Sequence, residues 1–284
     1  MSGWQPTSPC TPGACVDAPA RITALPRAAV RLTAVLALLL VGLALSPLGT
    51  RIPSRAIRGW CRWIVRAAGV RLRVSGPGAP AEGGLLLVAN HVSWLDVPLL
   101  AAVRPARMLA KSEIRGWPVA GWMAARGGAL FIDRSRLRAL PATVAGIAEV
   151  LRTGQAVAVF PEGSTWCGRA QGPFRPAAFQ AALDAGVPVQ PVSIRYRLAD
   201  GSAGTAASFV GEDSLFTSVW RVVSARGLVA EASLLRAIPP GSRPDRRALA
   251  RAAQPPAPEG AHRPYGATGT VAPGLRPRLS GSSA

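Results

Sequence analysis

The feature that most constrains the fold is an alternation of short apolar runs with helical patterns. Six runs rich in Val, Ile, Leu and Ala are bounded by Gly or Pro, at residues 70–74, 84–89, 128–132, 156–160, 187–196 and 228–235. Between two of them, Ser135 to Thr153 places apolar residues on one helical face, with a serine at the start and Gly154 as a stop signal. Strands that alternate with helices predict an α/β sandwich.

The two ends of the chain differ from this central part in composition. The ends of the chain are rich in Pro, Gly, Ala, Ser and Thr and poor in large apolar side chains, so we expect residues 1–28 to be a disordered tail and residues 241–284 to be a disordered basic tail. Residues 29–75 are predicted to associate with a membrane, through an apolar helix followed by a basic amphipathic helix. Residues 76–240 are predicted to form the large globular domain.

The membrane prediction starts from the tract Leu32 to Leu48, which is apolar apart from Thr33 and Ser46. Its length is near the lower limit of roughly 17 to 25 residues for crossing a bilayer, so it either spans or lies in one leaflet. A secretory signal is the alternative, but no clear cleavage site follows before Arg51. Seven arginines follow the tract up to residue 73 and three precede it, which predicts a cell-membrane protein with a cytoplasmic domain.

The segment from Arg55 to Ala68 is predicted to be an amphipathic helix. Ile57, Trp60 and Ile64 recur at helical spacing on one side, and arginines recur on the other. This pattern suits the headgroup region of an anionic membrane, and a surface helix packed on the core is the alternative.

The formal net charge of +19 favours acidic partners such as anionic lipid, coenzyme phosphates, acidic carrier proteins or nucleic acid. Since Lys111 is the only lysine among 33 basic residues, a general preference for arginine codons accounts for part of this charge. The four cysteines lack the paired spacing of a zinc site, so we expect no structural metal and reduced thiols in a cytosolic setting.

A histidine and an aspartate follow the run that ends at Ala89. His91 and Asp96 are five residues apart, and they meet only if His91 lies in the turn and Asp96 reaches back from the first turn of a helix. Asp96 would then accept a proton from one ring nitrogen and leave the other free to act as a base. The alternative is an N-capping aspartate near a core histidine.

Two further runs also end in polar residues. Arg134 follows the run 128–132 and suits phosphate, although a solvated arginine beside Asp133 is the alternative. Glu162 and Gly163 follow the run 156–160 in a tight turn that suits hydroxyl and phosphate contacts, and alone it is a turn with an exposed glutamate.

Taken in order, these segments resemble the four motifs of the glycerolipid acyltransferase superfamily, most closely the bacterial 1-acylglycerol-3-phosphate acyltransferases. The matching segments are Asn90 to Asp96, Gly128 to Arg134, Phe160 to Thr165 and Val187 to Val192, within Gly76 to Ile238. The resemblance implies a mixed sheet flanked by helices, with residues 76–240 as the catalytic domain. Trp166 and Cys167 after the third motif depart from the expected pattern.

The resemblance implies a role for each matching residue. His91 would be the catalytic base and Asp96 its partner, while Arg134, Glu162, Gly163 and Lys111 would bind the acceptor. The reaction would move a fatty acyl group to the sn-2 hydroxyl of lysophosphatidate and form phosphatidic acid. The acyl donor would be acyl-CoA or an acyl-carrier protein as cosubstrate, with no bound cofactor, and membrane phospholipids would be partners.

Three alternatives stay open at this point. Within the same chemistry, the acceptor would be another lysolipid such as lyso-ornithine lipid. A covalent mechanism through Ser93 or Cys167 lacks a nucleophile motif. A non-catalytic membrane or nucleic-acid binder is the alternative of a different class, and no nucleic acid is expected because the basic residues are dispersed and no binding module is recognised.

Overall fold

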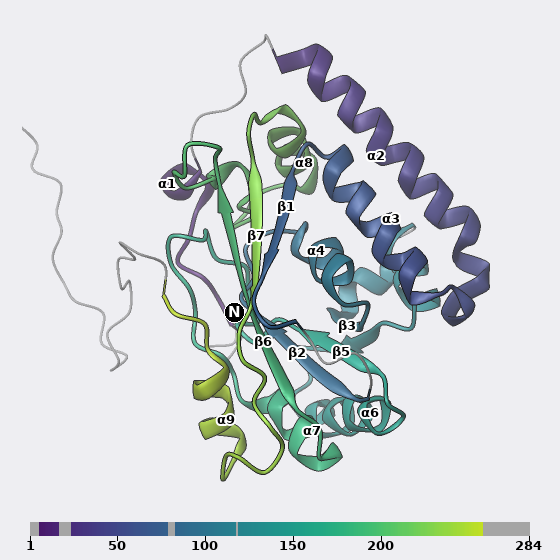
Figure 1. Ribbon diagram of the computed structural model, residues 1–284, viewed down its shortest axis with the longest axis vertical. Helices are drawn as coiled ribbons and strands as arrows, with labels where there is room; N and C mark the ends of the chain where they lie inside the picture. The colour runs from purple at the N-terminus through teal and green to yellow at the C-terminus, as the bar shows by residue number, and fades with distance from the viewer. Residues whose placement is uncertain (1–5, 17–23, 79–82, 118, 258–284) are drawn as a thin grey trace, which may run out of the picture.

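A seven-stranded sheet runs through the computed structural model, which describes residues 6–16, 24–78, 83–117 and 119–257 (Figure 1). The strands are β1 (Arg71–Ser75), β2 (Leu85–Ala89), β3 (Arg107–Lys111), β4 (Leu130–Ile132), β5 (Ala156–Val159), β6 (Val189–Arg197) and β7 (Val229–Leu234). Their order is β1-β7-β6-β2-β5-β3-β4, and every neighbouring pair is parallel except β6 and β7. The predicted mixed sheet is therefore confirmed.

Helices cover both faces of the sheet. They are α1 (Pro12–Cys15), α2 (Leu25–Leu45), α3 (Ser54–Ala67), α4 (Asp96–Val103), α5 (Ala120–Arg126), α6 (Leu140–Arg152), α7 (Ala177–Ala185), α8 (Leu215–Ser224) and α9 (Arg246–Ala253). Alternate residues of β2 point to opposite faces, so Leu87 packs in a core with α3 and α4, and Leu86 in a second core with α6, α7 and α9. The chain therefore has three layers, with helices on either side of the sheet.

The predicted boundary at residue 76 is wrong, because the strand before it belongs to the sheet. β1 pairs with β7 from Arg71 to Ser75. The helix before it is also tied to the domain, since Val65 of α3 is 1% exposed and belongs to the first core. The predicted amphipathic helix is present as α3, and its apolar face packs on the domain.

The predictions of disordered tails are wrong in part. Asp245 caps α9 by accepting hydrogen bonds from the backbone N–H groups of Arg247 and Ala248, and Leu249 is buried in the second core. Residues 6–16 are also placed, with Cys10 only 6% exposed. Both segments have few apolar residues, but some of these, such as Cys10 and Leu249, are buried against the domain. The remaining parts of the predicted tails, 1–5, 17–23 and 258–284, lie outside the described residues.

The helix predicted from Ser135 begins later in the structure. A short 3-10 turn, Leu137–Ala139, precedes α6, which starts at Leu140 with a proline in its first turn. Ser135 bonds to Asp133 instead, through both its backbone N–H (2.9 Å) and its hydroxyl (2.5 Å). This local turn competes with a helix cap at the serine.

Candidate active site

The predicted site residues emerge along one edge of the sheet. β2, β5, β3 and β4 are parallel neighbours in that order, so their carboxyl ends meet at the same edge. His91 follows β2, Glu162 follows β5, Lys111 ends β3, and Arg134 follows β4. This is the edge at which ligands gather in open α/β sheets.

His91 and Asp96 meet as the spacing requires. Asp96 is the first residue of α4, and its Oδ2 lies 2.8 Å from Nδ1 of His91. The same oxygen accepts hydrogen bonds from the backbone N–H groups of Val92 (2.7 Å) and Ser93 (2.8 Å). These bonds hold the turn after β2 so that the ring of His91 lies against the carboxylate. Asp96 is 0% exposed, which removes water as a competitor for these bonds.

This contact sets the state of the imidazole ring. A carboxylate at Nδ1 favours the tautomer with the proton on Nδ1, so Nε2 carries the free lone pair. The ring stacks on Phe160 with 3.9 Å between centroids and 10° between planes, which fixes its orientation. Because the side chain is 21% exposed, Nε2 remains available to a reactant at the strand edge.

Two residues that hold the dyad in place were not found from the sequence. Asn90 bridges β2 to β6 by donating to the carbonyl of Ile194 (2.9 Å) and accepting its N–H (2.7 Å). Tyr196 donates its hydroxyl to Oδ1 of Asp96 at 2.7 Å. Burial, followed by the charge of Asp96, raises the pKa of Tyr196 well above its ordinary value, so the phenol keeps its proton. Tyr196 lies a hundred residues from Asp96, and no local pattern links them.

Glu162 points into the protein and holds the turn that carries His91. Its Oε2 accepts the backbone N–H of His91 at 2.6 Å, and its Oε1 accepts that of Gly172 at 2.9 Å. Burial raises the pKa of Glu162 to about 8, although these two N–H donors act in the opposite direction. Since both oxygens already have backbone donors and the residue is 3% exposed, Glu162 positions His91, and its predicted contact with the acceptor stays a prediction.

Arg134 reaches from β4 to the turn after β5. Two strand spacings, roughly 10 Å, separate these strands, and Nη1 of Arg134 donates to the carbonyl of Gly163. Burial lowers the pKa of the guanidinium; Glu113 opposes this and Arg175 adds to it. Arg175 also packs near Gly163 and donates its backbone N–H to Pro161 (3.0 Å), so it is a second cation here that the sequence analysis missed.

The remaining predicted residues are placed differently. Lys111 is exposed at the end of β3, between the strands that carry Glu162 and Arg134. Gly163 has φ 74°, a left-handed conformation that a residue with a Cβ rarely adopts. A Cβ there would also lie 2.6 Å from Cγ of Pro6, so both the backbone conformation and the packing of Pro6 require a glycine at this position.

The two alternative nucleophiles are not positioned for covalent catalysis. Ser93 is 0% exposed, and its hydroxyl accepts the backbone N–H of Leu95 at 3.3 Å. Cys167 is 6% exposed and lies in a separate cluster with Cys10, Trp166 and Val210. The geometry therefore favours His91 acting on an incoming hydroxyl.

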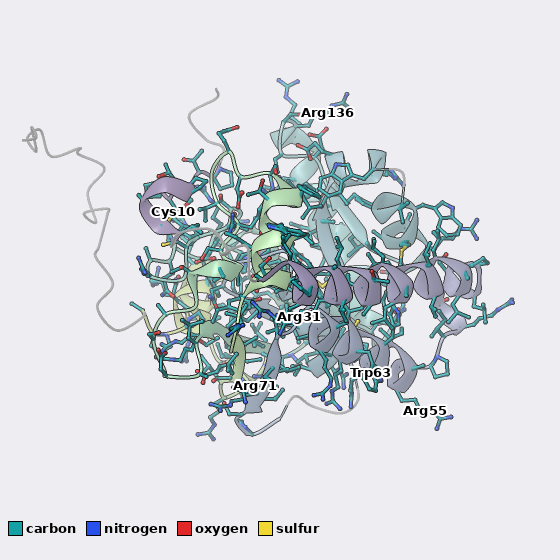
Figure 2. The ribbon with its side chains drawn as sticks, turned by 90° about the horizontal axis from the view of Figure 1, so that it is seen from above. Cys10, Arg31, Arg55, Trp63, Arg71 and Arg136 are labelled. Carbon is teal, nitrogen blue, oxygen red and sulfur yellow. The ribbon has the colours of Figure 1, made fainter. Side chains whose placement is uncertain are left out.

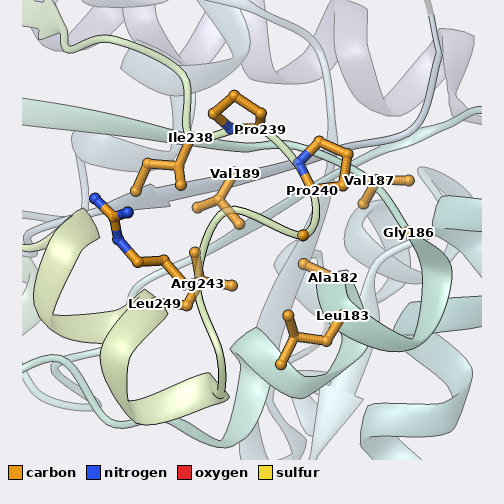
Figure 3. Close-up of a pocket in the computed structure, with 11 residues that line it drawn as sticks. Ala182, Leu183, Gly186, Val187, Val189, Ile238, Pro239, Pro240, Arg243 and Leu249 are labelled. Atoms are coloured by element: carbon orange, nitrogen blue, oxygen red, sulfur yellow. The ribbon is translucent and has the colours of Figure 1, made fainter.

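An apolar pocket elsewhere on the domain is not part of this site. Its lining comes from α7, α9 and the segment between β7 and α9, and includes Val189, Ile238 and Leu249 (Figure 3). Val189 begins β6, whereas the turn that carries His91 lies beside Ile194 further along the same strand. The pocket therefore lies toward the opposite edge of the sheet from His91.

Several known proteins are similar to this chain over most of its length. A family model described as Acyltransferase matches residues 71–195. The chain is 41% identical over 209 residues to a lyso-ornithine lipid O-acyltransferase of Pseudomonas aeruginosa, covering 72% of this chain and 78% of the relative. It is 36% identical over 196 residues to a 1-acyl-sn-glycerol-3-phosphate acyltransferase of Neisseria meningitidis, covering 69% and 76%.

A solved structure shares the fold at lower sequence identity. The crystal structure of the 1-acyl-sn-glycerophosphate acyltransferase of Thermotoga maritima superposes with a TM-score of 0.53 at 19% identity, covering 78% of this chain and 92% of that chain. The family model, the two relatives and the shared fold lead to one conclusion: the chain belongs to the acyltransferase family.

Proposed function

We propose that the chain transfers a fatty acyl group from acyl-CoA or an acyl-carrier protein to the sn-2 hydroxyl of 1-acyl-sn-glycerol-3-phosphate, forming phosphatidic acid. The observation that carries this proposal is the 2.8 Å contact between Asp96 and Nδ1 of His91, which leaves Nε2 free at the sheet edge. The guanidinium of Arg134 bonds to the turn after β5, the neighbour of the strand that carries His91. A base and a phosphate-binding cation on neighbouring turns suit an acceptor that has a hydroxyl close to a phosphate.

The reaction is a direct acyl transfer. Nε2 of His91 takes the hydroxyl proton as the acceptor oxygen attacks the thioester carbonyl carbon. The tetrahedral intermediate then breaks its C–S bond, and the imidazolium returns the proton to the leaving thiolate. Asp96 stabilises the imidazolium between the two steps. General-base catalysis of this kind contributes about 10²- to 10⁴-fold, and positioning of the reactants supplies much of the rest.

In this proposal the cations along the same edge of the sheet bind the headgroup of the acceptor. Arg134 and Arg175 flank the turn at Gly163, and Lys111 lies on the strand between β4 and β5. Arginine binds phosphate through two parallel N–H bonds, whereas lysine acts as a point charge. Arg134 is therefore the first headgroup ligand in this proposal, with Lys111 and Arg175 as supporting charges.

Lyso-ornithine lipid is the second candidate acceptor. The relative named for that activity shares 41% identity with this chain, against 36% for the one named for 1-acyl-sn-glycerol-3-phosphate. Its headgroup carries a carboxylate, which an arginine binds in the same bidentate manner. The two candidates therefore share the dyad and the reaction, and differ only in which anion Arg134 holds.

The proposed location is the cell membrane, with the catalytic domain on the cytoplasmic side. Within the described residues, the helical stretch Leu25–Arg51 is long and apolar enough to cross a bilayer, and only 11% of its most apolar part is buried. Exposed apolar side chains gather on α2, on the 3-10 turn Ser46–Arg51, on α3 and at the start of α5. They are Leu36, Leu40, Val41, Leu45, Leu48, Trp63, Val119 and Trp122. These elements contact one another directly or through the turn. An apolar surface of this kind bordered by arginines suits an anionic membrane.

The decisive experiment compares acceptors and the base in one assay. Purified protein in detergent would receive acyl-CoA with radiolabelled lysophosphatidate or with lyso-ornithine lipid, beside His91→Ala. Phosphatidate formation that is lost in His91→Ala supports the proposal. If product forms only from lyso-ornithine lipid, the proposed acceptor is wrong and the proposed mechanism stands. Full activity in folded His91→Ala excludes His91 as the base.

A further inference from the structure

Three cysteine side chains from distant parts of the chain meet outside the catalytic dyad. The sulfur atoms of Cys10, Cys15 and Cys167 all lie within 4.8 Å of one another, and all three are free thiols. Cys10 and Cys167 are each 6% exposed, and Cys15 is half-buried. The expectation of no metal rested on the absence of paired cysteine spacing in the sequence, whereas the fold brings Cys167 to Cys10 and Cys15 from a distant segment.

The cluster is held together by backbone contacts from three segments. Thr11 caps α1, and its carbonyl accepts the N–H of Cys15 at 3.0 Å, which brings Cys15 back over Cys10. Cys167 follows the catalytic turn, where the N–H of Trp166 donates to the carbonyl of His91 at 2.8 Å. The carbonyl of Cys167 accepts the hydroxyl of Ser208 at 2.9 Å. The three side chains are therefore gathered as free thiols, with no disulfide among them.

We propose that Cys10, Cys15 and Cys167 form a binding site for a thiophilic d¹⁰ cation, Zn²⁺ or Cu⁺. Metal–sulfur bonds of about 2.3 Å place three thiolate sulfurs about 3.8 to 4.0 Å apart, which is within the observed separation. Zn²⁺ would add a water molecule as its fourth ligand on the half-exposed side of Cys15, and Cu⁺ would take the three sulfurs alone. Binding releases the thiol protons to solvent. A disulfide would use two of the thiols and leave the third, whereas a metal ion uses all three.

A metal ion bound by the cluster would connect the N-terminal segment to the segment that follows β5. Pro6 packs against Gly163, close enough that a Cβ on the glycine would lie 2.6 Å from Cγ of Pro6. A bound ion would therefore fasten residues 6–16 to the segment that follows Glu162 and Gly163. Figure 2 shows Cys10 on the opposite side of the molecule from Arg55 of α3, so the site lies away from this helix. Cys15, which is half-buried, is the member of the cluster that faces water.

The test is metal titration of the reduced full-length protein in detergent, after treatment with a chelator. Co²⁺ serves as a spectroscopic probe, because thiolate ligands give it strong charge-transfer absorption, and Zn²⁺ and Cu⁺ are then added as competitors. We expect one Co²⁺ per chain, displaced by the preferred ion. Loss of a residue that only hydrogen-bonds to a metal ligand weakens metal affinity by roughly 10- to 100-fold. Loss of a ligand itself should weaken it at least as much, so we expect this from each of the single variants Cys10→Ser, Cys15→Ser and Cys167→Ser.

Cys61→Ser is the matched control, since Cys61 is buried in α3 and lies outside the cluster. It should bind metal as the unsubstituted protein does. Hydrogen exchange gives a second measurement: the N–H groups of Cys15 and Val16, which bond within α1, should exchange more slowly when metal is bound. Equal metal binding by the triple Cys→Ser variant, or a Cys–Cys disulfide that forms in place of metal uptake, would overturn the proposal.

Discussion

Asp96 connects more of the site than any other single side chain described here. It bonds to the ring of His91, to two backbone N–H groups of the turn and to the hydroxyl of Tyr196. We expect Asp96→Asn to lower kcat by about 10²- to 10⁴-fold, because an amide that donates to Nδ1 would place the ring proton on Nε2. Steady-state kinetics should show a change in kcat larger than the change in KM.

Tyr196→Phe is the matched control for this prediction. It removes one hydrogen bond to Oδ1 and keeps the ring, while the contact between Asp96 and His91 stays intact. We expect a loss of stability of about 1 to 3 kcal/mol in urea unfolding, with kcat reduced by less than the asparagine variant reduces it. Wild-type kcat in a folded Asp96→Asn protein would contradict the role given to Asp96.

Glu162 should make the stability of the protein depend on pH in an unusual direction. Burial raises its pKa from 4.5 to about 8, so the folded state holds this proton more tightly than the unfolded state does. Its contribution is fully present below the unfolded pKa and is lost as pH rises from about 4.5 through about 8. The loss should be on the order of a few kcal/mol.

Glu162→Gln tests this dependence because glutamine does not titrate. Urea unfolding from pH 5 to pH 9 should show a steeper decline for the unsubstituted protein than for the variant. The variant also places an amide against one of two backbone N–H donors, so its stability at pH 5 should be lower. Parallel pH profiles for the two proteins would show that Glu162 does not carry the expected shift.

The sequence was sufficient to predict the local part of the site. His91 and Asp96 are five residues apart, so one turn brings them together, and parallel strands bring Glu162 and Arg134 to the same edge. Tyr196, Asn90 and Arg175 act through contacts between segments that are distant in the sequence, and no local spacing links them to their partners. Only the packed fold shows that Tyr196 and Asn90 support the dyad and that Arg175 lies beside the turn at Gly163.

At the scale of elements, the errors of prediction have a common physical cause. β3 begins and ends with charged residues and has no β-branched side chain, so its sequence lacks a strand signal, although it pairs with β4 and β5. α9 and α1 are short and lie in Pro- and Gly-rich surroundings, and burial of a few side chains decides their structure. Tertiary contacts outweigh local propensity in all three.

Two arginines of α2 hold it against α8 by donating hydrogen bonds to backbone carbonyls at the end of α8. Arg27 donates to the carbonyl of Ser224 (2.6 Å), and Arg31 to those of Val223 (3.0 Å) and Ala225 (2.6 Å). These carbonyls lie at the C-terminus of α8, where backbone acceptors lack helical partners and cations are favoured. The arginines therefore join α2 to the domain by satisfying groups that α8 leaves open.

Replacing both arginines should loosen α2 from the domain. We expect Arg27→Ala with Arg31→Ala to lower the free energy of unfolding by about 1 to 3 kcal/mol and to speed proteolysis near α2. Arg55→Ala with Arg62→Ala makes the same change in charge at exposed positions of α3 and is the control. Equal behaviour of the two double variants would mean that the contacts to α8 contribute nothing beyond net charge.

At the scale of the whole molecule, α2 is attached to the domain over much of its length. Its first turns bind α8 through Arg27 and Arg31, and in its second half the carbonyl of Leu38 accepts the indole N–H of Trp60 at 2.9 Å. The turn Ser46–Arg51 that follows contacts α5. α2 therefore runs alongside α3 on the outside of the domain (Figure 1). A helix that crossed the bilayer in this arrangement would carry the polar domain into the hydrocarbon.

We therefore expect α2 to lie in one leaflet, with both of its ends on the side of the catalytic domain. Leu25→Cys and Thr50→Cys place thiols at exposed positions before and after the apolar stretch. With protein added to preformed vesicles, a membrane-impermeant maleimide should label both variants equally, measured above the labelling of the unsubstituted chain. If the helix spans instead, one of the two thiols will react only after detergent opens the vesicles, because it then lies in the lumen. That result would require α2 to separate from α3 and α8 when it inserts. The contacts made by Arg27 and Arg31 would then exist only before the protein enters the membrane.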